Sequence, residues 1–151
     1  MKIVPVLAVA LCALAPLPAA AASPKQVEAC MAANDDAGRP QFSCIGMLYR
    51  DCTKQPNAED AACAAGELAF WNAQLAAWSK QAFQAVAAYP ELAKDQADAQ
   101  KSWSAFRDKS CTIADKVDPG MMPGGSAYCR AQVTAERVFL LRQIGTALSE
   151  H

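Results

Sequence analysis

Seven cysteines are the residues with the clearest chemical potential in this sequence. One of them, Cys12, lies in an apolar N-terminal segment, and the other six follow it. An even number of cysteines in a short exported chain is typical of disulfide bonds. Zinc or an iron–sulfur cluster is less well supported, because no C-x-x-C pair occurs and the only histidine is the terminal His151. We expect no metal or cofactor, and three disulfides among Cys30, Cys44, Cys52, Cys63, Cys111 and Cys129.

Side chains suited to catalysis are few. A serine or cysteine nucleophile needs a base, usually histidine, and His151 is the last residue. Glu67, one helical turn before Trp71, could act as a carboxylic acid of raised pKa, as in glycosidases. Pairing with an arginine of a neighbouring helix explains a buried carboxylate better. We therefore expect a Glu67–Arg107 ion pair, with Arg137 as the competing partner, and a protein that is not an enzyme.

Two acidic pairs, Asp35-Asp36 and Glu59-Asp60, are candidates for calcium ligands. Neither pair has the alternating spacing of an EF-hand loop. Glu59 and Asp60 instead fit the first turn of a helix, where the helix dipole favours negative charge. We interpret both pairs as charges at helix ends.

The first 22 residues predict a signal peptide. Lys2 precedes an apolar run from Ile3 to about Leu17, and alanines at positions 20 and 22 precede Ser23. Small residues at these two places favour cleavage between Ala22 and Ser23. The run is short for a bilayer span and is interrupted by prolines.

Cys12 raises the alternative of a lipid anchor. Leu11 stands directly before it, where lipidation signals have a small residue, so this alternative is disfavoured. No later segment is apolar enough to cross a membrane. We expect residues 23–151 to form a single domain that is periplasmic or secreted.

Composition excludes two further classes of protein. A chain of 151 residues with 53% hydrophobic and 19% charged residues is too apolar to be disordered. A formal net charge of −1 argues against a nucleic-acid partner, because such proteins present a basic surface to phosphates.

The chain has the pattern of helices alone. Alanine, glutamine, glutamate, lysine and leucine are frequent, and alternating β-branched stretches are missing. Apolar residues recur at steps of three and four, as amphipathic helices require. The predicted fold is all-α: an antiparallel bundle of three long helices with a disulfide-stapled N-terminal helical hairpin. The expected helices cover residues 24–35, 41–52, 59–88, 90–117 and 126–148.

The predicted helix 90–117 carries its own stripe of inward-facing positions. Trp103 lies at the middle of this stripe, so we expect it to be buried where the three long helices meet. Two methionines, Met121 and Met122, follow in a turn-rich loop and could form either an exposed contact or a plug for the loop. The stripe is Leu92, Gln96, Ala99, Trp103, Phe106, Ser110, Ile113 and Val117.

Folding the helices back on one another favours one disulfide pattern. Antiparallel helices around residue 121 bring Cys111 within a turn of Cys129. Similar chain reversals lie between Cys30 and Cys44 and between Cys52 and Cys63. The other possible pairings of six cysteines stay open. The favoured pairs are Cys30–Cys44, Cys52–Cys63 and Cys111–Cys129.

Two sequence motifs carry a family resemblance. Residues 100–111 read Q-x-x-W-x-x-F-R-x-x-x-C and precede a Gly-Gly loop, a cysteine and T-x-x-R. Residues 63–75 read C-x-x-x-E-x-x-x-W-N-x-x-L. Together they resemble the N-terminal domain of LprI-like lysozyme inhibitors, although asparagine at position 72 replaces a common aspartate. Besides cysteines, the motif residues are Glu67, Trp71, Gln100, Trp103, Phe106, Arg107, Gly124, Gly125, Thr134 and Arg137.

The resemblance implies an exported binding protein that contacts lysozyme-like muramidases. The alternative is a structural or stress-related module that binds another envelope protein without inhibiting lysozyme. No inhibitory residue is carried over from the family, so the partner-binding residues are unknown at this stage.

Overall fold

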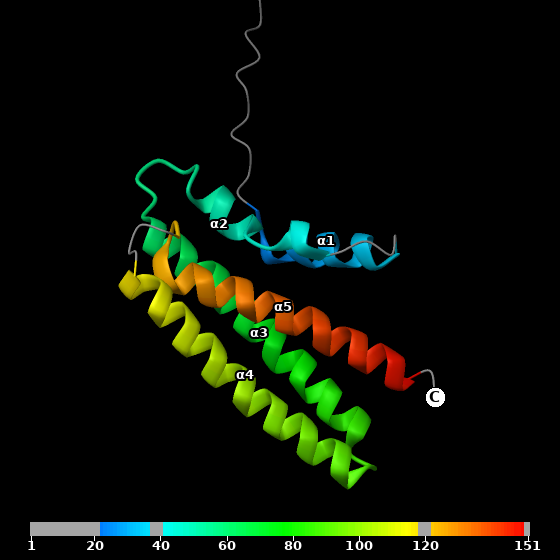
Figure 1. Cartoon of the computed structure of the whole chain (residues 1–151). Coiled ribbons are helices and arrows are strands. Elements are labelled where there is room, and N and C mark those ends of the chain that lie inside the picture. Colours follow the sequence, from blue (N-terminus) through cyan, green and yellow to red (C-terminus); the bar gives the residue numbers. More distant parts are fainter. Residues whose placement is uncertain (1–21, 37–40, 118–121, 150–151) are drawn as a thin grey trace, which may run out of the picture.

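The computed structural model describes residues 22–36, 41–117 and 122–149, and all regular elements in these ranges are helices. The predicted all-α fold is therefore confirmed. Residues 1–21 of the predicted signal peptide, the predicted helix break at Gly38–Pro40, Met121 and His151 lie outside the described residues. The elements, shown in Figure 1, are α1 (Pro24–Asp36), the 3-10 helix η1 (Gln41–Cys44), α2 (Met47–Cys52), α3 (Asp60–Val86), α4 (Pro90–Val117) and α5 (Gly125–Ser149).

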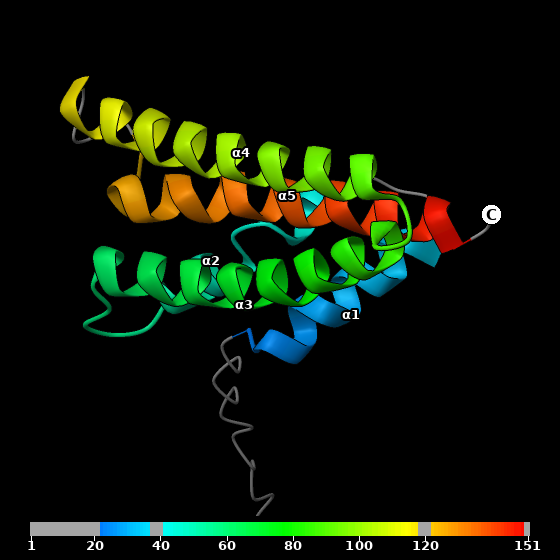
Figure 2. The ribbon, with the colours of Figure 1, turned by 90° about the horizontal axis from the view of Figure 1, so that it is seen from below.

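The three long helices form the bundle, and α5 is its central member. In Figure 2 α5 runs between α3 and α4, and both pack along it more than they contact each other. The hairpin of α1, η1 and α2 covers the bundle on the side away from α4 (Figure 1). As a result, α3 and α5 have neighbours on several sides, whereas α4 packs mainly against α5 alone.

The hydrophobic core lies between α3, α5 and the N-terminal hairpin. Trp71 of α3 is fully buried and packs edge-to-face on Phe70 and Phe139, with ring centres 5.0 and 5.5 Å away. Val27 of α1 and Ala135 of α5 are also fully buried in this core. Edge-to-face aromatic contacts add to the stabilisation from burial.

Three disulfides join elements that are adjacent along the chain. They form the three pairs that the folding-back geometry favours. In the chain-entropy model, loops of 14, 11 and 18 residues each contribute roughly 3 kcal/mol. Cys30–Cys44 joins α1 to η1, Cys52–Cys63 joins α2 to α3, and Cys111–Cys129 joins α4 to α5.

The prediction of one helix over residues 41–52 is wrong, because Gly46 divides it into η1 and α2. Gly46 has a φ of 76°, in the left-handed region that glycine adopts without strain. A Cβ at this position would lie 2.3 Å from the hydroxyl oxygen of Tyr128. The backbone angle and the close approach together require glycine at the start of α2.

The prediction that the whole stripe of α4 faces inward is also wrong. Leu92, Phe106, Ile113 and Val117 are exposed, and Trp103 is half-buried. A helix that packs mainly against one neighbour buries a narrow stripe, so α4 turns only part of its apolar positions toward α5.

Candidate functional site

The motif residues fall into two groups in the structure, and the first group is structural. Glu67 of α3 is fully buried. Its Oε1 accepts hydrogen bonds from the Gly46 amide at 2.9 Å and from the Trp71 indole Nε1 at 2.5 Å. Its Oε2 accepts a hydrogen bond from the Tyr49 amide at 2.9 Å. A carboxylate with three N–H donors is satisfied without a cation.

Glu67 therefore caps the N-terminus of α2 from another helix. The first amides of a helix lack partners within the helix, and a negative charge there is favourable. The predicted Glu67–Arg107 ion pair is wrong, because α2 covers this part of α3 and α4 packs on α5 instead.

The Gly-Gly loop before α5 is structural as well. Gly124 has a φ of 76°, and a Cβ there would lie 2.7 Å from the Cβ of Ala64 on α3. The adjacent rings of Tyr49 and Tyr128 are 4.4 Å apart between centres. Gly125 follows with a φ of 62°. The first turn of α5 can thus approach both α2 and α3 closely.

The second group of motif residues meets between α4 and α5, and we call it the Trp103 cluster. It consists of Gln100, Trp103 and Arg107 from α4, with Thr134 and Arg137 from α5. The guanidinium carbons of Arg107 and Arg137 lie 5.0 and 6.0 Å from the centre of the Trp103 ring. Arg107 Nη1 donates to Thr134 Oγ1 at 3.3 Å, and Arg137 Nε donates to Gln100 Oε1 at 3.1 Å.

The two arginines of the cluster differ in how their charge is balanced. Arg107 Nε lies 2.9 Å from the Asp108 carboxylate. Arg137 is only 8% exposed, and its Nη2 has no hydrogen-bond partner among the described residues. No carboxylate pairs with Arg137 in that part of the chain, and burial lowers its pKa. The cluster therefore offers a buried cation that is incompletely neutralised.

Gln96 adds a second unpartnered donor one turn before Gln100. Its side chain is 9% exposed, and its Nε2 has no partner within the described residues. The sequence analysis assigned Gln96 only as an inward-facing position of this helix. Its polar side chain within an apolar stripe is the sequence signal that could have singled it out. Groups that donate hydrogen bonds without a neighbouring base or nucleophile are suited to binding rather than to catalysis.

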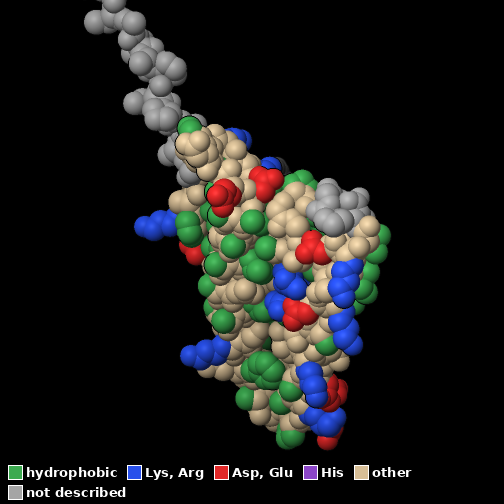
Figure 3. Space-filling view, turned by 90° about the vertical axis from the view of Figure 1, so that its left-hand side faces the viewer, with side chains coloured by type: hydrophobic (Ala, Val, Ile, Leu, Met, Phe, Trp, Pro, Cys, Tyr) green, Lys and Arg blue, Asp and Glu red, His purple; other side chains and the backbone are tan. Residues whose placement is uncertain are grey.

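Phe106 is the motif residue that the fold leaves most exposed. Its side chain is 61% exposed, next to the partly buried Arg107. Figure 3 shows hydrophobic and basic side chains side by side along one edge of the molecule. Aromatic residues and arginine are enriched at the centres of protein interfaces.

Metal-ion sites are not indicated in the residues that the structure describes, since no three histidine, cysteine or acidic side chains gather there. Asp60 lies in the first turn of α3 and Glu59 immediately precedes it, as expected of helix-end charges. Met122 lines a small pocket with Cys111, Cys129 and Asp115, at the junction of α4 and α5. None of the described helices has the length and hydropathy of a membrane span.

Comparison with known proteins matches this geometry to one family. The model of the family described as lysozyme inhibitor LprI matches residues 50–141, more than half of the chain. The matched range holds Glu67 and the whole Trp103 cluster, whereas Gly46 and Tyr49, whose amides donate to Glu67, lie before it. Searches of curated proteins and of solved structures find no match. The chain belongs to the LprI lysozyme-inhibitor family.

Proposed function

We propose that this protein is exported and inhibits lysozyme-like muramidases by protein–protein contact, without catalysing a reaction itself. The family match over residues 50–141 carries this proposal. Three disulfides support a periplasmic or secreted location, because such bonds persist in oxidising compartments. We further propose that residues 1–22 are a signal peptide and that residues 23–151 are the single mature domain.

We propose that the contact surface includes Phe106 and Arg107. Glu67 and Gly124 have structural roles within the fold, whereas an exposed aromatic side chain on α4 has none. Trp103 and Thr134 hold the Arg107 guanidinium in place before any partner binds. Such preorganisation lowers the entropy lost on binding. Muramidases carry paired carboxylates around the scissile bond, which a cation can complement.

The test is peptidoglycan lysis by purified muramidases of several structural types, followed as loss of turbidity with increasing oxidised protein. We expect dose-dependent inhibition of at least one enzyme. Phe106→Ser should weaken inhibition about tenfold or more if this side chain is central to the contact. Ile113→Ser is the matched control, since Ile113 is 60% exposed on the same helix and lies outside the motif.

Ile113→Ser should retain at least the parental inhibition. Equal losses in Phe106→Ser and Ile113→Ser would contradict the proposed contact surface. If the folded protein inhibits none of the muramidases, the proposed function is wrong and the alternative of an envelope interaction module is favoured. Circular dichroism of each variant separates loss of contact from loss of fold.

A further inference from the structure

We propose that α4 pairs with α4 of a second copy of this chain, in antiparallel orientation, to form a homodimer. Four side chains define the α4 apolar stripe: Leu92, Ala99, Phe106 and Ile113. They are spaced by seven residues and are all exposed. This spacing is close to two helical turns, so it keeps the four side chains on one narrow face of α4. This inference does not rest on the proposed function.

The stripe is separate from the positions that α4 uses within its own chain. Gln96 is buried, Trp103 and Ser110 are half-buried, and the Trp103 ring contacts Arg137 of α5. The stripe alternates with these positions along the helix. With Val117 at its end, the stripe extends for about 35–40 Å at the rise of an α-helix.

Charges beside the stripe favour a second copy in one orientation. Glu91 and Asp95 lie toward the N-terminal end of α4, and Lys109 and Lys116 lie toward its C-terminal end. Parallel pairing would bring like charges together, whereas antiparallel pairing brings each acidic end onto a basic end. Within the described chain, neither Asp95 nor Lys109 takes part in an ion pair, so both are available to a partner.

The same orientation also matches side-chain sizes. Placing Leu92 opposite Ile113 of the second copy puts the small Ala99 opposite the large Phe106. In this register Asp95 lies opposite Ser110 of the second copy, directly beside Lys109 in the sequence. A two-fold axis repeats each contact, so the interface closes at two chains. Because Phe106 lies in the stripe, the dimer and a muramidase complex formed through Phe106 exclude each other.

Sedimentation equilibrium of the purified oxidised protein over a concentration series tests the pairing. We expect a reversible rise from the mass of one chain to that of two. Leu92→Ser should weaken dimerisation about tenfold, equivalent to about 1.4 kcal/mol. Leu140→Ser is the control, because Leu140 on α5 has the same 45% exposure as Leu92 and lies outside the stripe. It should dimerise like the parent.

Charge exchange tests the antiparallel register. Asp95→Lys alone and Lys109→Glu alone should each weaken the dimer, because each places like charges opposite one another. The double variant should recover most of the parental affinity, and added salt should weaken the parent. Monomers at every concentration, equal effects of Leu92→Ser and Leu140→Ser, or no recovery in the double variant would each overturn the proposal.

Discussion

At the scale of single residues, the Glu67 carboxylate is the polar group with the most demanding surroundings. Three N–H groups donate to it while it is fully buried. In Glu67→Gln an amide nitrogen replaces one acceptor and faces a donor, which leaves a buried donor unsatisfied. We expect a loss of about 2–3 kcal/mol in the free energy of unfolding, measured by urea denaturation of the oxidised protein. Glu136→Gln, at an exposed site on α5, should change it little, and equal losses would contradict the cap.

Substitution of Arg137, unlike that of Glu67, should not lower the free energy of unfolding substantially. Burial disfavours its charged form, so its pKa is lowered and its protonated state opposes folding at all pH values below that pKa. Deprotonation would relieve this cost only as pH rises toward the unfolded value, far above neutrality. Arg137→Met removes the buried charge at neutral pH and keeps much of the side-chain volume. We expect stability within about 1 kcal/mol of the parent or above it, measured by thermal unfolding. A loss of several kcal/mol would show that the contacts of Arg137 with Gln100 and Trp103 outweigh the cost of burying its charge.

The contacts of individual residues were harder to predict from the sequence than the positions of the helices. The position of Glu67 beside an apolar stripe indicated burial, and the expectation of a charged partner followed from that. Two of its three partners are backbone amides of a segment about twenty residues earlier, and an amide carries no residue-specific signal; the third is the indole of Trp71. Trp103 was expected in the core for the same reason, its place in the stripe, but it is half-buried, with the guanidinium groups of Arg107 and Arg137 against its ring.

At the scale of elements, the bounds of the long helices were predictable from the sequence. Which face of each helix would be buried was not. Proline marks the start of α4, and apolar steps of three and four predict its whole length. The same steps cannot show whether one neighbour or two will cover the helix. The break at Gly46 was not predicted, because a single glycine is tolerated within helical patterns. The close approach of Tyr128, which requires glycine at this position, is visible only in the structure.

The attachment of α4 predicts the effect of removing its disulfide. α4 is held to α5 by Cys111–Cys129 and by the largely polar Trp103 cluster. Cys111→Ala combined with Cys129→Ala should cost roughly 3 kcal/mol. Hydrogen exchange followed by mass spectrometry should show faster exchange in α4 than in α3. Removing Cys30 and Cys44 together should leave exchange in α4 unchanged, and uniform acceleration in both variants would argue against a separately attached α4.

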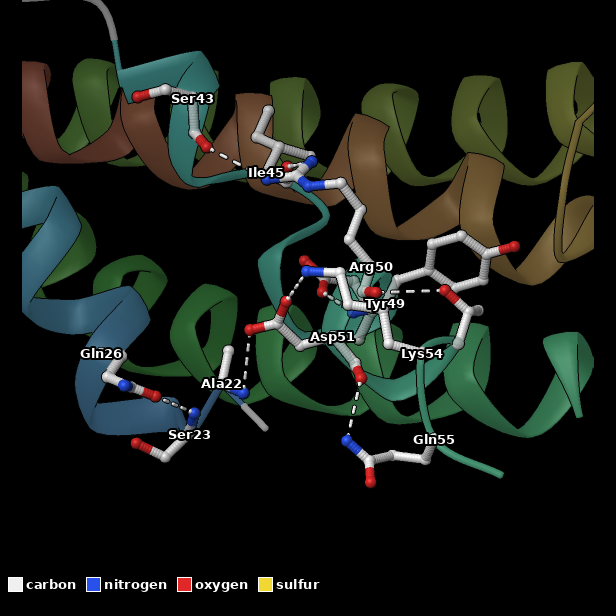
Figure 4. A network of polar contacts seen from close by, with 12 residues as sticks. Ala22, Ser23, Gln26, Ser43, Ile45, Tyr49, Arg50, Asp51, Lys54 and Gln55 are labelled. Carbon is white, nitrogen blue, oxygen red and sulfur yellow. Dashed lines mark hydrogen bonds and ion pairs between the residues drawn. The ribbon is translucent and has the colours of Figure 1, made fainter. Parts of the chain in front are cut away.

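At the scale of the whole molecule, the beginning of the described chain is tied to the N-terminal hairpin. The Ala22 amide donates to Asp51 Oδ2 at 3.0 Å, and the same carboxylate pairs with Lys54 (Figure 4). The hydrogen bond from Lys54 is the main cause of the lowered pKa of Asp51. Cleavage between Ala22 and Ser23 would replace the Ala22 amide with a nearby ammonium group on Ser23. Cleavage would thus exchange a neutral donor to Asp51 for a positive charge near it at the mature N-terminus.

Export can be checked by the intact mass of the protein recovered from outside the cytoplasm. We expect a chain that begins at Ser23 and is lighter by six hydrogens than the fully reduced formula. A mass that retains residue 1, or one that carries a diacylglyceryl group on Cys12, would contradict the predicted cleavage. A free thiol among the other six cysteines would contradict the disulfide set.

The order of the three disulfides along the chain has a consequence for biogenesis. The six cysteines among the described residues are bonded in consecutive pairs, Cys30–Cys44, Cys52–Cys63 and Cys111–Cys129, and no bridge encloses another. When such a chain emerges N-terminus first from a ribosome or a translocation channel, each thiol meets its native partner before the next pair appears. An oxidase that joins cysteines in the order of their appearance would therefore produce the native set directly. The protein should mature normally in cells that lack a disulfide isomerase.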